Sequence, residues 1–119
     1  MIYLDNAATT KPSEAAVEAM CRAAECFGNP SSLYGLGLDA EKLINGAKAE
    51  IASKLGIDSK CIYFTSGGTE ANNTAVFGTA YSRMRMGKRL ITSVIEHPSV
   101  LEAFKKLESE GFDVVYIGV

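Results

Sequence analysis

Short runs rich in β-branched and aromatic residues alternate along this chain with longer runs of helical periodicity, and this alternation constrains the fold more than any other feature. Strands are predicted at residues 2–4, 61–65, 89–95 and 114–119. Helices are predicted at residues 12–27, 38–55, 69–86 and 98–110. The recurring order β-α-β-α-β is typical of a parallel or mixed sheet with helices on its faces. We therefore predict an α/β fold.

Residues with known capping preferences predict where the helices begin and end. Ser13 is suited to cap the first helix, and Gly28 and Gly56 are suited to stop the first and the second. Between them, residues 28–37 are rich in Gly, Asn, Pro and Ser and predict a loop. Pro98 suits the first position of the last helix. Apolar residues at helical spacing predict the inner faces of the second and last helices: Ala40, Leu43, Ala47, Ile51 and Leu55, then Val100, Phe104 and Leu107.

Charge and hydropathy exclude several classes of protein. The 119 residues carry 12 basic and 14 acidic side chains, a net charge of −2, which argues against a nucleic-acid partner. We expect no membrane partner and a cytoplasmic location, because no apolar run could span a bilayer and residues 1–5 do not resemble a signal peptide. No metal site is expected, because a Cys/His zinc site would need His97 and all three cysteines at unusual spacing: Cys21, Cys26 and Cys61.

The segment Phe64–Asn73 carries the strongest sign of a binding site. A predicted strand runs into Ser66-Gly67-Gly68-Thr69, and a helix follows. The first amides of a helix have no partner within it, and glycines let the backbone approach a phosphate closely. Gly67, Gly68 and Thr69 are therefore candidates for a phosphate-binding turn. The alternative is a turn with a helix cap and no ligand.

The only histidine follows a predicted strand, in Glu96-His97-Pro98. Ligands of open α/β sheets bind at the carboxyl ends of the strands, so we expect His97 and the glycine turn at the same sheet edge. An imidazole there could stack on a planar cofactor and transfer protons. The alternative is a histidine that only caps the following helix.

Four segments in this order resemble the start of the cysteine desulfurases, which are pyridoxal-phosphate (PLP) enzymes of the class V aminotransferase family. The resemblance covers essentially the whole chain and is nearest to the NifS/IscS branch. The matching residues are Tyr3–Thr10, Phe27–Ser32, Phe64–Asn73 and Glu96–Val100.

This resemblance implies a fold, a cofactor and site residues. The fold would be that of the large domain of aspartate-aminotransferase-type enzymes, and the chain a single partial domain. Residues 1–37 would be an N-terminal segment and 38–119 the start of the PLP-binding domain. Gly67, Gly68 and Thr69 would hold the PLP phosphate, and His97 would stack on the cofactor ring and act in catalysis. The substrate-pocket candidates are Asn6, Ala7 and Ala8.

The resemblance also implies an activity. Family members convert L-cysteine to L-alanine and transfer the sulfur as a persulfide toward iron–sulfur clusters or thiolation. They are homodimers, and a sulfur-acceptor or scaffold protein is the expected partner. One small departure is Tyr34, where many relatives have histidine.

A larger departure concerns the reacting groups. The family's PLP lysine lies in a downstream Ser-His-Lys segment and its catalytic cysteine on a later loop, and neither is found here. We therefore expect an N-terminal fragment that is inactive alone. The alternatives are a fragment of another class V enzyme (a selenocysteine lyase or aminotransferase), a noncatalytic module that binds phosphate or a partner, and an unrelated phosphate-binding α/β domain.

Overall fold

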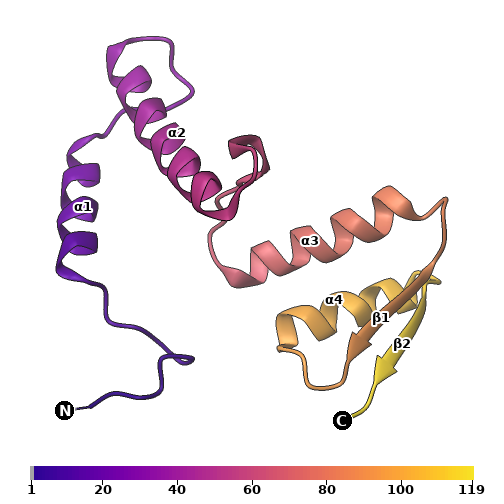
Figure 1. The fold of residues 1–119 in the computed structure, drawn as a ribbon. Coiled ribbons are helices and arrows are strands. Elements are labelled where there is room, and N and C mark those ends of the chain that lie inside the picture. The colour runs from indigo at the N-terminus through magenta and orange to yellow at the C-terminus, as the bar shows by residue number, and fades with distance from the viewer. Residues whose placement is uncertain (1) are drawn as a thin grey trace. The chain divides into compact units, whose positions relative to one another are not determined.

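A computed structural model describes residues 2–119 as two compact units, one ending at Tyr63 and one running from Phe64 to Val119 (Figure 1). The first unit contains helices α1 (Glu14–Glu25) and α2 (Gly35–Leu55) and the 3-10 helix η1 (Ser59–Cys61). The second contains helices α3 (Gly68–Arg83) and α4 (Pro98–Ser109) and strands β1 (Arg89–Ser93) and β2 (Asp113–Ile117). No helix within residues 2–119 is long and apolar enough to cross a membrane.

Helix α1 begins where its capping residue predicts. The Ser13 hydroxyl accepts a hydrogen bond from the Ala16 amide at 3.2 Å, which satisfies one of the free amides of the first turn. The predicted end was wrong by two residues, because the helix stops at Glu25 and Cys26 is its C-cap. Gly28 therefore does not serve as the helix stop.

Two glycines let the loop after α1 pack against the first turn of α2. A Cβ on Gly37 would lie 2.7 Å from the Asn29 carbonyl oxygen and closer still to that of Ser32. A Cβ on Gly28 would overlap the Leu36 carbonyl. This close approach lets α2 begin at Gly35, so the predicted loop over residues 28–37 was three residues too long. Gly56 ends α2 as predicted, in the left-handed conformation at φ 67°.

Two of the predicted strands, at residues 2–4 and 61–65, do not form. Residues 2–4 are irregular, and the chain from Ile62 to Thr65 is irregular after η1. Instead of being buried, Tyr63 is 80% exposed and Phe64 is 55% exposed. A strand needs a neighbour to satisfy its backbone groups, and the only strands among residues 2–119 pair with each other. The sequence pattern alone could not supply that partner.

The second unit contains the parallel pairing that the α/β prediction requires. β1 and β2 are parallel, with Arg89 opposite Asp113 and Ile91 opposite Val115, and α4 connects them. Both strands and α3 are shorter than predicted, since β1 ends at Ser93, β2 at Ile117 and α3 at Arg83. The α/β fold class is confirmed.

A small apolar core joins the elements of the second unit. Ala80 of α3, Leu107 of α4 and Phe112 before β2 are buried, and they pack with partly buried side chains from α3, β1 and β2: Val76, Phe77, Leu90 and Val114. The predicted inner face of α4 is confirmed at Leu107, which is fully buried, whereas Val100 and Phe104 are half-buried.

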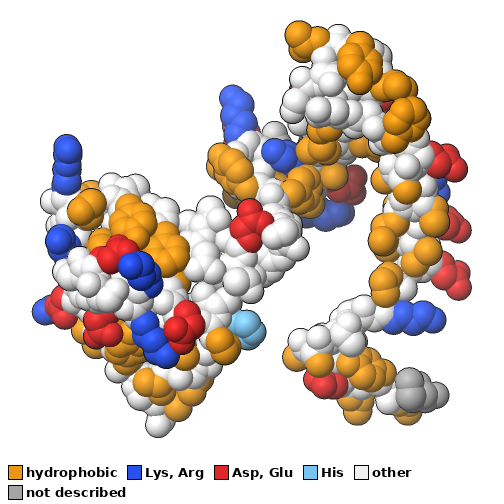
Figure 2. Space-filling view, turned by 180° about the vertical axis from the view of Figure 1, so that it is seen from behind, with side chains coloured by type: hydrophobic (Ala, Val, Ile, Leu, Met, Phe, Trp, Pro, Cys, Tyr) orange, Lys and Arg blue, Asp and Glu red, His pale blue; other side chains and the backbone are white. Residues whose placement is uncertain are grey.

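Large apolar side chains also lie on the surface of each unit, as the orange areas of Figure 2 show. In the second unit, Ile91 is 61% exposed and Ile117 is 55% exposed. On α2, the predicted inner face is buried at Ala40, but Leu43 and Leu55 are exposed. Strands with apolar side chains on both faces are typical of parallel sheets that are covered on both sides.

Candidate functional site

The turn that leads into α3 is held by a carboxylate of the helix itself. Glu70 accepts two hydrogen bonds from Ser66, one from its hydroxyl at 2.6 Å and one from its amide at 2.7 Å. These bonds lower the pKa of Glu70 below its ordinary value, the hydroxyl contributing most and the amide next. The turn is therefore ordered by an ionised side chain that is already paired with Ser66.

The amino end of α3 remains open to a ligand. Gly67 is its N-cap and supplies no side chain to the first amides. A Cβ added at Gly67 or at Gly68 would meet nothing within 4 Å, so there is free space beside the backbone. Thr69 follows with a hydroxyl at the second position of the helix. Free amides, open space and a hydroxyl are the donor set that a phosphate group requires, so these residues fit it.

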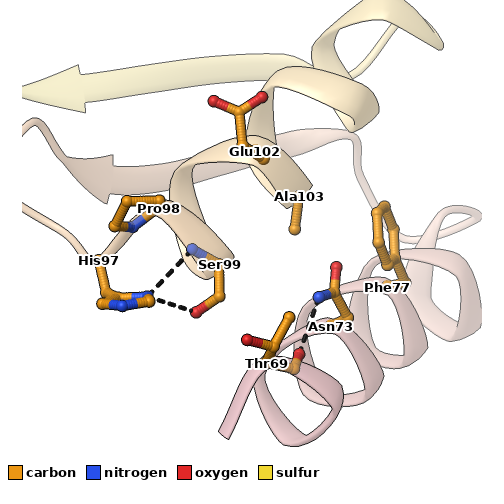
Figure 3. A pocket seen from close by; sticks show the side chains of 8 residues that line it. All are labelled: Thr69, Asn73, Phe77, His97, Pro98, Ser99, Glu102 and Ala103. Carbon is orange, nitrogen blue, oxygen red and sulfur yellow. Dashed lines mark hydrogen bonds between the residues drawn. The ribbon is translucent and has the colours of Figure 1, made fainter.

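His97 lies between β1 and α4 and is the N-cap of α4 (Figure 3). Its Nδ1 accepts a hydrogen bond from the Ser99 amide at 3.1 Å and lies 2.8 Å from the Ser99 hydroxyl. Pro98 occupies the first helical turn, as predicted. The capping interpretation of His97 is therefore correct. It does not exclude a role in binding, because the side chain remains exposed.

The amino ends of α3 and α4 border a common open hollow (Figure 3). The hollow has two adjoining parts, and Thr69, His97 and Ser99 line both of them. The first part has a volume of about 370 Å³ and is also lined by Gly68 and Asn72. The neighbouring part, of about 400 Å³, extends along α3 and α4 and is also lined by Asn73, Phe77, Pro98, Glu102 and Ala103. The structure thus brings Gly68, Thr69 and His97 to one hollow, with Gly67 at the end of the same helix.

Several residues that line this hollow were not predicted as site residues, and two of them, Asn72 and Ser99, connect its two helices. The Asn72 amide nitrogen donates to the Ser99 hydroxyl at 2.8 Å, which connects α3 to α4 beside His97. Ser99 lies two residues after His97, near the start of α4. A serine so close to a helix start often forms local hydrogen bonds, and this was the signal in the sequence for a contact with His97. Asn72 lies within the motif Phe64–Asn73, but that motif did not predict its contact with Ser99, because the two residues are 27 positions apart.

The remaining candidates belong to the first unit. Asn6, Ala7 and Ala8 lie in an exposed turn, in which the Ala8 amide donates to the Asp5 carbonyl at 3.1 Å and the Thr10 hydroxyl to the Asn6 carbonyl at 3.3 Å. Their role in a substrate pocket stays a prediction. The three cysteines are free thiols, and no group of three or more potential ligands within residues 2–119 could hold a metal ion.

Comparison with known proteins identifies a family and similar structures. The protein-family model described as "Aminotransferase class-V" matches residues 2–119 of the chain. The chain is 45% identical over 119 residues to a putative cysteine desulfurase IscS 1 of Bacillus subtilis (strain 168), covering 99% of this chain and 31% of that protein. It is 46% identical to a cysteine desulfurase IscS of Methanosarcina thermophila, covering 99% of this chain and 30% of that protein.

Solved structures agree with these relatives. A structure named NIFS-like protein superposes with a TM-score of 0.89 at 36% identity, covering 98% of this chain and 32% of that one. A structure named SspA in complex with cysteine superposes with a TM-score of 0.86 at 40% identity, covering 97% of this chain and 33% of that one. The chain therefore spans about a third of the length of the proteins that it matches.

Proposed function

The chain belongs to the class V aminotransferase family, and from this premise we propose that it provides the phosphate-binding turn and the ring-contacting histidine of a PLP-dependent cysteine desulfurase. Such an enzyme takes sulfur from L-cysteine, releases L-alanine and holds the sulfur as a persulfide on one of its own cysteines. The sulfur then passes to an acceptor or scaffold protein. Cysteine desulfurases among the relatives support this proposal.

One observation carries the proposal. The uncapped amino end of α3 and the exposed His97 line the same hollow. The amides of Gly68 and Thr69 and the Thr69 hydroxyl would bind the phosphate, and the open space at Gly67 and Gly68 would admit it. Glu70 does not occupy the amides of Gly68 and Thr69, because its carboxylate accepts its hydrogen bonds from Ser66.

The cofactor and the residues of this chain would have different roles in the reaction. PLP supplies an electron sink that weakens the bonds at the α-carbon of an amino acid. The residues of this chain bind the phosphate through α3, contact the ring through His97 and transfer a proton at its imidazole. Asn6, Ala7 and Ala8 are proposed to contact the substrate.

The lysine and the catalytic cysteine are proposed to lie outside these 119 residues. The single histidine is followed by Pro98, so the chain has no Ser-His-Lys segment, and none of its three cysteines has the family's loop context. The chain alone is therefore expected to release no alanine from L-cysteine. In the complete enzyme we propose a cytoplasmic homodimer.

The phosphate assignment is tested by cofactor retention in the protein that contains this chain. Thr69→Ala removes a hydroxyl that would donate to a charged group, so PLP affinity should fall by about ten- to a hundredfold. Gly68→Leu should lower it as well, because the added side chain fills the space beside the amides. Thr74→Ala is the matched control, since Thr74 is an exposed residue of α3 that does not line the hollow. Cofactor absorbance after gel filtration measures retention.

Equal retention in the Thr69, Gly68 and Thr74 variants would show that the phosphate does not bind at α3. His97→Ala should slow alanine release much more than it lowers PLP retention, and full turnover in that variant would remove the proposed role of His97. A selenocysteine lyase or an aminotransferase would keep the same phosphate site. The products formed from L-cysteine and L-selenocysteine decide between these enzymes.

A further inference from the structure

A chain of hydrogen bonds leads from α3 to the imidazole of His97. The Asn72 side-chain amide donates to the Ser99 hydroxyl at 2.8 Å, and this hydroxyl lies 2.8 Å from His97 Nδ1. Asn72 and Ser99 are half-buried, whereas His97 is exposed. The three side chains come from two helices that pack against each other, so their arrangement depends on the tertiary fold.

The direction of these bonds fixes the position of the imidazole proton. The Ser99 amide can only donate, and it points at Nδ1 from 3.1 Å. Nδ1 must therefore be unprotonated and accept. Because the Asn72 amide donates to the Ser99 oxygen, the hydroxyl hydrogen of Ser99 is free to point at Nδ1 as well. Two donors thus converge on Nδ1, and the neutral ring carries its proton on Nε2.

We propose that Asn72 and Ser99 are positioning residues that hold His97 as the Nε2–H tautomer in the hollow at the amino ends of α3 and α4. The Ser99 amide orients the ring through the helix cap, and the pair of side chains locks its tautomer. Within residues 2–119 no group forms a hydrogen bond with Nε2, so the Nε2–H remains available to a ligand.

This positioning defines what neutral His97 offers to the reaction. With its proton on Nε2, the ring donates a hydrogen bond at that atom and cannot accept a proton there. Nδ1 is occupied by the two Ser99 donors, so the proton transfer proposed for His97 requires these donors to move aside when Nδ1 takes up the proton. This consequence rests on the proposed function, because it matters for catalysis only if a cofactor or substrate occupies the hollow.

The tautomer can be read directly by NMR, without cofactor. The chain has a single histidine, so chain labelled with ¹⁵N-histidine gives one set of imidazole signals. Long-range ¹H–¹⁵N correlations distinguish a protonated from an unprotonated ring nitrogen. At a pH where the ring is neutral, the wild-type chain should show an unprotonated Nδ1 and a protonated Nε2. A protonated Nδ1, or an average of both tautomers, would overturn the proposal.

Variants assign the effect to the two side chains. Ser99→Ala should lower the ratio of the Nε2–H to the Nδ1–H tautomer by roughly two- to tenfold, which is the equilibrium effect of one net hydrogen bond. Asn72→Ala should change it in the same direction while leaving Ser99 and its cap in place, so it remains informative if Ser99→Ala disturbs the fold. Ser99→Thr keeps the hydroxyl and should restore the wild-type signals.

Asn73→Ala is the matched control for the imidazole signals. Asn73 is the neighbouring asparagine on α3, but its amide donates to the Thr69 carbonyl at 2.8 Å and not to Ser99. Its removal should leave the tautomer unchanged. Equal signals in the wild-type, Ser99→Ala and Asn72→Ala chains would overturn the proposal, as would an equal shift in all three alanine variants.

A second readout uses the PLP-loaded enzyme that contains this chain. Ser99→Ala should lower kcat for alanine release while PLP retention stays at the wild-type level, and Ser99→Thr should restore kcat. Unchanged kcat in Ser99→Ala would remove the catalytic consequence of the tautomer. If the wild-type enzyme retained no PLP, the proposed function would fail, whereas the NMR result on His97 would stand or fall by itself.

Discussion

Gly37 and Gly46 allow the same substitution to be compared at two positions of one helix. Both lie in α2, but Gly37 is buried against the preceding loop and Gly46 is exposed. In a helix interior, alanine is favoured over glycine by about 0.5–1 kcal/mol. A Cβ on Gly46 would meet nothing within 4 Å, so Gly46→Ala should stabilise the chain by that amount.

Gly37→Ala should have the opposite sign. Its Cβ would lie 2.7 Å from the Asn29 carbonyl oxygen and closer to that of Ser32, whereas ordinary contact begins at 3.4 Å. Both contacted oxygens belong to the backbone, and the Ser32 amide donates to the Asn29 carbonyl oxygen at 2.9 Å. The loop therefore cannot make room for the Cβ by rotating a side chain. Overpacking of this kind costs about 1–3 kcal/mol, which outweighs the gain in helix propensity.

Urea unfolding followed by the helical circular dichroism signal measures both changes. With a slope of about 1–3 kcal/mol per molar urea, Gly37→Ala should lower the midpoint by roughly 1 M, and Gly46→Ala should raise it slightly. If both variants shifted the midpoint in the same direction, the close approach of the loop to α2 would be refuted.

Two further predictions concern the second unit and its turn. Leu107→Ala should destabilise the chain by about 2–5 kcal/mol, because Leu107 is 0% exposed. Leu33→Ala should change stability by at most about 0.5 kcal/mol, because Leu33 is 95% exposed. Equal thermal midpoints for the two variants would contradict the assigned core. The hydrogen bonds from Ser66 lower the pKa of Glu70 from its ordinary 4.5. They therefore stabilise the folded chain above about pH 4.5, and this stabilisation is lost as the pH falls through the lowered pKa. Ser66→Ala should raise the pKa of Glu70 in an NMR titration, and an unchanged pKa would contradict the hydrogen bond from the Ser66 hydroxyl.

Predictions from local chemistry were the most successful part of the sequence analysis. Ser13 caps α1, Gly56 ends α2 in the left-handed conformation, and Pro98 begins α4. Each of these features depends on atoms within about four residues along the chain, so a short stretch of sequence contains both partners. The same holds for the turn at Gly67 and Gly68, where a carboxylate four residues from Ser66 orders the backbone.

Predictions that required a distant partner were less successful. Residues 61–65 have the composition of a buried strand, but no partner strand is present among residues 2–119, and Tyr63 is exposed. The role of Gly28 was also misjudged. The sequence favours a helix stop there, whereas the structure uses the missing side chain to admit the Leu36 carbonyl.

The candidate site shows the same division. A glycine turn at the amino end of α3, followed by Thr69, and a histidine after β1 are predicted by short motifs, because the ends of helices and strands depend on adjacent residues. The link from Asn72 through Ser99 to His97 Nδ1 is not, because its first two members are 27 residues apart. Such a link forms only when α3 packs on α4 in one register, and that register is set by the burial of Ala80, Leu107 and the apolar side chains around them.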